Sequence, residues 1–72
     1  MNKARRAELA KASSLLEDAK ALIEAACNDE QEAFDNLAEG LKQTTMSTAI
    51  DLMTSALEGI ENAINDTEEA QA

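Results

Sequence analysis

The sequence predicts an all-α protein, an antiparallel two-helix hairpin that dimerises into a four-helix bundle. The chain of 72 residues contains no proline, two glycines and one aromatic residue, a composition typical of helices. Apolar residues recur at alternating spacings of three and four in residues 9–37 and 46–64, as in amphipathic helices. One cysteine and no histidine exclude an internal disulfide and the usual zinc sites, so we expect oligomerisation to stabilise so short a chain.

The first apolar stretch is a heptad seam that runs without a slip through residues 9–37. Large residues take one core position: Leu9, Leu16, Ile23 and Leu37. Alanines take the other: Ala12, Ala19, Ala26 and Ala33. Leu15 and Leu22 flank the seam and widen it to a stripe that suits a bundle better than a two-stranded coil. We therefore predict a first helix of about residues 3–38, with Asn2 as its N-cap.

Two places along this helix affect its length. Asn28 and Asp29 are poor helix formers and good caps, so a break there is an alternative to one continuous helix. Because the apolar phase continues beyond them, we favour the continuous helix. We expect it to end near Glu39, where Gly40 can adopt the left-handed C-terminal conformation and Leu41 can fold back over the last turn.

The second apolar stretch predicts a helix of about residues 46–66 with the same spacing. Its stripe consists of Met46, Ile50, Met53, Leu57, Ile60 and Ile64. Its flanks are Ala49, Ala56 and Ala63. The pattern fades from Asp66 onward, so we expect residues 67–72 to fray.

A predicted loop of about residues 39–45, with Thr44 or Thr45 as a cap, is short enough to make the two helices pack antiparallel. The hairpin brings the basic first turn beside the acidic end of the chain: Lys3, Arg5 and Arg6 beside Asp66, Glu68 and Glu69. A lone hairpin exposes half of each stripe, so we predict a homodimer. The residues predicted for its interface are Leu9, Ala12, Leu16, Ala19, Ile23, Ala26, Leu37, Met46, Ile50, Met53, Leu57, Ile60 and Ile64.

The chain carries a net charge of −9, and many of its acids lie on the outer ridges of the predicted helices. The predicted partner-binding acidic surface consists of Glu17, Asp18, Glu24, Glu32, Asp35, Glu39, Asp51 and Glu58. Steps of seven residues separate such charges by about 10 Å, so two adjoining ridges imitate the charge of a phosphate backbone. An acidic surface argues against direct binding of nucleic acid or of an anionic membrane and permits a basic protein partner. The alternative is an acidic face that is merely solvated.

No set of residues predicts catalysis, a cofactor or a metal. Glu30 lies in the apolar seam, either as a metal-binding or pH-sensitive carboxylate or as a polar residue that fixes the register. Di-iron bundles need Glu-x-x-His motifs, which a chain without histidine cannot supply. Cys27 has no second cysteine or histidine to activate it, so we interpret it as a small, partly buried residue. We expect a protein that is not an enzyme.

The sequence also predicts a cytoplasmic location. No run approaches the roughly 18 apolar residues of a membrane span. The basic start, residues 1–6, leads into an amphipathic stretch rather than the apolar segment of a signal peptide.

Three segments resemble small acidic helical proteins that bacterial phages and mobile elements encode. They are residues 1–6, residues 15–24 (LLEDAKALIE) and, most specifically, residues 29–37 (DEQEAFDNL). Those proteins carry a proline where this chain has Ala38, which would end the first helix there. The resemblance supplies no catalytic residues. It implies a context, the cytosol of a bacterial host, in which small acidic phage proteins are often inhibitors of host defence or host enzymes.

These observations lead to three functional hypotheses. The first is a non-enzymatic phage-type protein that binds and inhibits a host protein, such as a defence or nucleic-acid-binding protein, through its acidic helical surface. The second is a self-assembling structural module whose only partner is itself. The third is an oligomeric sequestrant of an anionic nucleotide signal, gripped by Lys3, Arg5 and Arg6 of different protomers. The expected pairing of these cations with the acidic end of the chain argues against the third.

Overall fold

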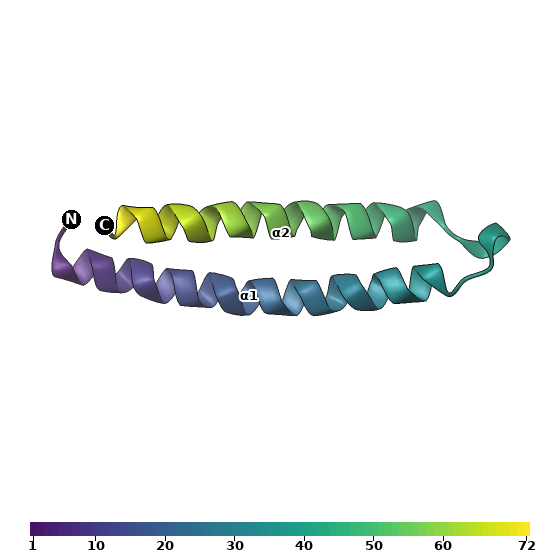
Figure 1. Ribbon diagram of the computed structural model, residues 1–72, viewed down its shortest axis with the longest axis horizontal. Coiled ribbons are helices and arrows are strands. Elements are labelled where there is room, and N and C mark those ends of the chain that lie inside the picture. The colour runs from purple at the N-terminus through teal and green to yellow at the C-terminus, as the bar shows by residue number, and fades with distance from the viewer.

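The protein is an antiparallel hairpin of two long helices, α1 (Lys3–Asp35) and α2 (Thr44–Ala70), joined through a short 3-10 helix, η1 (Glu39–Leu41) (Figure 1). The computed structural model describes all of residues 1–72. The Cα atoms span a rod of 57 × 14 × 13 Å, with both chain termini at the end opposite η1. Neither helix has a stretch apolar enough to cross a bilayer. The predicted all-α hairpin is confirmed.

Helix α1 begins at the predicted cap and ends earlier than expected. The Oδ1 atom of Asn2 accepts a hydrogen bond from the backbone N–H of Arg5 at 2.8 Å. The helix runs through Asn28 and Asp29 without the alternative break. It stops at Asp35, with Asn36 as its C-cap, and the chain becomes extended at Ala38 (φ −61°, ψ 147°), a conformation that proline also adopts.

The loop closes differently from the prediction. No glycine has a positive φ, so the left-handed cap expected at Gly40 does not form. Instead η1 turns the chain within the predicted loop, and Glu39 is its first residue. The Lys42 ammonium pairs with the Glu39 carboxylate at 3.2 Å and lies 5.2 Å from the centre of the Phe34 ring. A cation–π contact of this kind ties the loop to the last turn of α1.

Helix α2 is longer than predicted at both ends. Gln43 is its N-cap and makes no side-chain cap hydrogen bond, so neither Thr44 nor Thr45 acts as the cap. The expected fraying of residues 67–72 is replaced by helix to Ala70. The Thr67 hydroxyl donates to the Ile64 carbonyl, and the Gln71 side-chain amide donates to the Thr67 carbonyl, both at 2.9 Å. Thr67 and Gln71 also continue the half-buried stripe of α2, which explains why the helix persists.

Because each helix has only the other as a neighbour, the half-buried positions mark the contact between them. On α2 they include the whole predicted stripe, from Met46 to Ile64. On α1 and just beyond its end they are Leu9, Ser13, Leu16, Lys20, Ile23, Cys27, Glu30, Phe34 and Leu37, with Ala12 and Ala19 half-buried beside them. At the other two predicted alanine positions, the residues that follow in the sequence make the contact instead. Cys27 and Phe34 are half-buried, whereas Ala26 and Ala33 are exposed, because larger side chains bury more apolar surface against α2.

The hairpin has almost no interior. Ile64, which is 3% exposed, is its one buried apolar residue, and Ser13, at 8%, is its one buried polar residue. A core this small contributes little to offset the entropy of folding in a chain of 72 residues. The exposed surfaces of the hairpin are therefore the candidates for its interactions.

Candidate interaction surfaces

Two side-chain contacts define the register of the helices. The Lys20 ammonium lies 2.6 Å from the Glu61 carboxylate, and the Cys27 sulfur lies 4.0 Å from the Thr54 hydroxyl. In both pairs the residue numbers add to 81, so residue i of α1 lies level with residue 81 − i of α2. Lys20 and Cys27 follow Ala19 and Ala26 in the sequence, so both contacts lie on the side of the hairpin away from these alanines.

One side of the hairpin is an apolar face. On α1 it consists of Ala12, Leu15, Ala19, Leu22, Ala26 and Ala33. On α2 it consists of Ala49, Leu52, Ala56, Gly59 and Ala63. Each of these positions comes one residue before a contact position, so it is turned by about 100° around the helix axis. Because the two helices are antiparallel, this turn brings both rows to the same side of the hairpin. Asp29 and Asp66 are the acids within the two rows.

The leucines of the apolar face protrude into solvent. Leu15, Leu22 and Leu52 are 60%, 73% and 66% exposed. Between them lie alanines and Gly59, at which an added Cβ would meet no atom within 4 Å. Large and small residues therefore alternate on this face, and its leucines stay mostly exposed.

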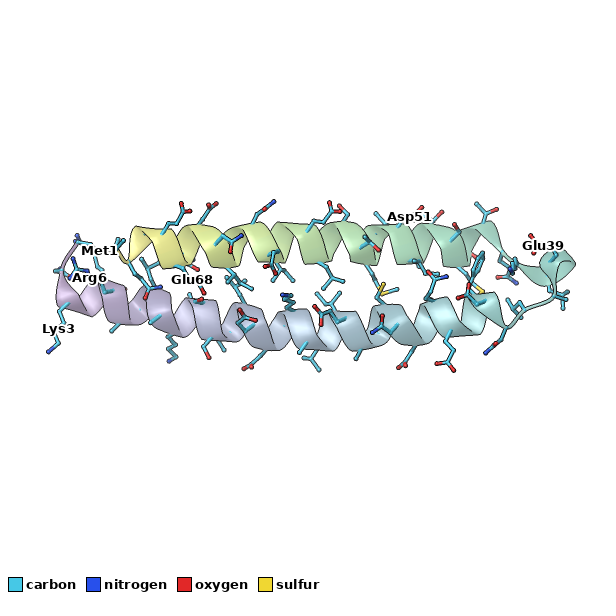
Figure 2. All side chains as sticks on the ribbon, in the orientation of Figure 1. Met1, Lys3, Arg6, Glu39, Asp51 and Glu68 are labelled. Carbon is cyan, nitrogen blue, oxygen red and sulfur yellow. The ribbon has the colours of Figure 1, made fainter.

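The opposite side is an acidic face, which consists of Glu17, Glu24, Asp35, Asp51, Glu58, Glu61 and Glu68. Five of these belong to the predicted acidic surface, and Figure 2 shows Asp51 on the outer side of α2. The other predicted acids lie elsewhere: Asp18 and Glu32 on the outer edge of α1 and Glu39 in η1. The sequence prediction missed Glu61 and Glu68, which the antiparallel register brings beside the ridge of Glu17 and Glu24.

Lys20 is the one cation within the acidic face. Its ammonium contacts Glu61 at 2.6 Å and Glu24 at 4.0 Å. The hydrogen bond to Glu61 and the charge of that carboxylate raise the pKa of Lys20 above its ordinary value of 10.5. Partial desolvation opposes this shift, and Glu17 and Glu24 add to it.

The raised pKa of Lys20 predicts that this residue stabilises the folded protein at neutral pH and that the stabilisation is lost at alkaline pH. The folded protein holds this proton more tightly than the unfolded chain, so the stabilisation is complete below pH 10.5 and declines above it. We expect Lys20→Met to lower the melting temperature by a constant amount between pH 7 and 9. That difference should shrink as the pH rises beyond 10.5, as thermal denaturation followed by circular dichroism would show. A difference that stays constant through pH 11.5 would contradict the assignment.

The basic first turn has no ion pair of its own. Figure 2 shows Met1, Lys3 and Arg6 at the end of the rod where Glu68 also lies. The cations with a carboxylate within 4.0 Å are Lys20 and Lys42, and not Lys3, Arg5, Arg6 or Lys11. The register places the acidic cluster level with residues 12–15 of α1, further along the rod than the basic first turn, so the two clusters do not face each other and form no ion pairs.

The predicted dimer interface is largely occupied within the chain. Of its 13 residues, 12 are half-buried or buried in the hairpin, and Ala26 alone is exposed. Ala12 and Ala19 lie at the border between this contact and the apolar face. The side chain of Glu30 is half-buried in the seam, and no three cysteine or carboxylate side chains gather in a group that could hold a metal ion.

Searches against known protein families, curated proteins and solved structures found no match to this chain.

Proposed function

We propose that the protein is a non-enzymatic interaction module that works as a homodimeric four-helix bundle. Its apolar faces are buried between the two copies, and its acidic faces point outward toward a basic protein. The observation that carries this proposal is the opposite character of the two faces on a hairpin that buries one apolar side chain.

The need for a second copy follows from the exposed leucines. Covering a leucine side chain contributes about 1.5–3 kcal/mol. Leu15, Leu22 and Leu52 of two copies therefore supply stabilisation comparable with the whole stability of a small domain. A four-helix bundle is the simplest assembly that covers them.

The acidic face supports a basic protein as the outside partner. Glu17 and Glu24 are one heptad apart on α1, as are Asp51 and Glu58 on α2, about 10 Å along each helix. Two such rows side by side present regularly spaced negative charge, which attracts positively charged surfaces. In the context that the phage resemblance implies, the partner is a host defence or nucleic-acid-binding protein in the bacterial cytosol, and its basic surface is blocked.

Capture from bacterial lysate tests the acidic face. We expect the immobilised protein to retain a partner from nuclease-treated lysate at low salt and to release it at high salt. Combined Glu17→Lys, Asp51→Lys and Glu58→Lys should reduce recovery at least tenfold, because all three change the acidic face. Mass spectrometry of the eluates measures the recovery.

A matched control variant distinguishes recognition by the acidic face from an effect of net charge alone. Combined Asp18→Lys, Glu32→Lys and Glu69→Lys changes the net charge equally at exposed positions on the outer edges of the helices. This control should retain the partner. Equal loss in both variants would contradict recognition by the acidic face.

The apolar face also supports a second function, a structural module whose only partner is itself. Under this function the lysate yields the bait alone, and both sets of substitutions change nothing but solubility.

A further inference from the structure

The proposed function includes a homodimer but does not specify how its two copies pack. We propose that the two apolar faces meet about a two-fold axis that is perpendicular to the helices. Helix α1 then packs antiparallel on the partner's α1, α2 packs antiparallel on the partner's α2, and the two loops lie at opposite ends of the bundle.

The sizes of the residues along each helix support this arrangement. On α1, Leu15 lies over the partner's Ala33 and Leu22 over the partner's Ala26, and in both pairs the numbers add to 48. On α2, Leu52 lies over the partner's Ala63, and Ala56 over the partner's Gly59, with numbers that add to 115. Large residues thus meet small ones, as close packing of helices requires.

A single axis satisfies both sets of pairs. The α1 pairs are centred on residue 24, and the α2 pairs on the midpoint between residues 57 and 58. The register of the hairpin, set by the separate Lys20–Glu61 and Cys27–Thr54 contacts, places residue 24 level with residue 57. The centres therefore agree to within about one residue, or about 1.5 Å along the helix.

The other two-fold arrangement packs less well. An axis parallel to the helices would put α1 on the partner's α2, with both loops at one end. The register then places Leu15 against the partner's Asp66 and Leu52 against the partner's Asp29. Covering these carboxylates with leucines costs desolvation without a compensating partner. In the proposed arrangement both aspartates meet alanines, Ala19 and Ala49 of the partner, whose short side chains leave room for water.

The area of the face also fits a second copy. The face extends over 22 residues of α1, about 33 Å, and over two helices, about 20 Å. This gives about 650 Å² per copy, near the roughly 800 Å² of a standard interface.

Disulfide cross-linking tests the geometry in the full-length protein. In a Cys27→Ser background, Leu15→Cys combined with Ala33→Cys places thiols that are about 27 Å apart within one chain and in contact across the proposed dimer. The control, Glu17→Cys with Asp35→Cys, has the same spacing on the acidic face. All four positions are exposed in the hairpin. Circular dichroism confirms the helical fold of each variant before mild oxidation.

We expect the first variant to form a covalent dimer at least tenfold faster than the control, with peptide mass spectrometry showing a bond between positions 15 and 33. The mass of the unsubstituted protein, from sedimentation equilibrium, separates the two proposals. A monomer would overturn the homodimer itself. A dimer in which neither variant cross-links, or in which the control cross-links faster, would overturn this geometry and leave the homodimer standing.

Discussion

Replacing Leu22 by glutamate is expected to raise the dissociation constant of the proposed homodimer by about a hundredfold to ten-thousandfold. Leu22 is the most exposed leucine of the hairpin, at 73%, and lies near the centre of the apolar face. The substitution removes one buried leucine from each copy, about 1.5–3 kcal/mol apiece, and each 1.4 kcal/mol changes the constant tenfold. Sedimentation equilibrium over a range of protein concentrations measures the change.

Ala21→Glu is the matched control for this prediction. It introduces the same charge one residue earlier, at an exposed position on the side of α1 away from the apolar face. The dissociation constant of this variant should stay within about threefold of the unsubstituted value, since surface charges contribute little. If Ala21→Glu dissociates the protein as strongly as Leu22→Glu, the apolar face is not the interface.

The second large effect is expected inside the hairpin. Ile64→Ala should lower the free energy of unfolding by about 2–4 kcal/mol, because it empties the one apolar position that the hairpin buries on its own. Urea denaturation followed by circular dichroism measures the loss. Protein concentration must be held constant, because association stabilises the folded state.

Ile60→Ala provides the comparison on the same helix. Ile60 is only half-buried against α1, so its truncation removes fewer contacts within the chain. We expect this variant to lose clearly less stability than Ile64→Ala. Equal losses would mean that the second copy covers Ile60 as completely as α1 covers Ile64, which contradicts the placement of the dimer contact on the apolar face.

Much of the hairpin could be predicted from local sequence. The cap at Asn2, the continuity of α1 and the stripe of α2 from Met46 to Ile64 depend on residues within a few turns of one another. The ends of the helices were harder to predict. The loop closes through η1 and the contact of Lys42 with Phe34, and α2 continues to Ala70 because Thr67 and Gln71 pack on α1. These contacts join residues whose proximity could not be predicted from the sequence.

The sequence by itself determined that this protein consists of two amphipathic helices joined by a short loop. Only the tertiary structure decided which side of α1 faces α2. A stripe that contains Ala26 and Ala33 and a stripe that contains Cys27 and Phe34 both fit the alternation of three and four residues. Periodicity therefore did not show which pair faces α2. Packing against α2 selected the larger side chains. That rotation left the alanines and leucines uncovered on one side, and the antiparallel register gathered Glu61 and Glu68 with the acids on the other.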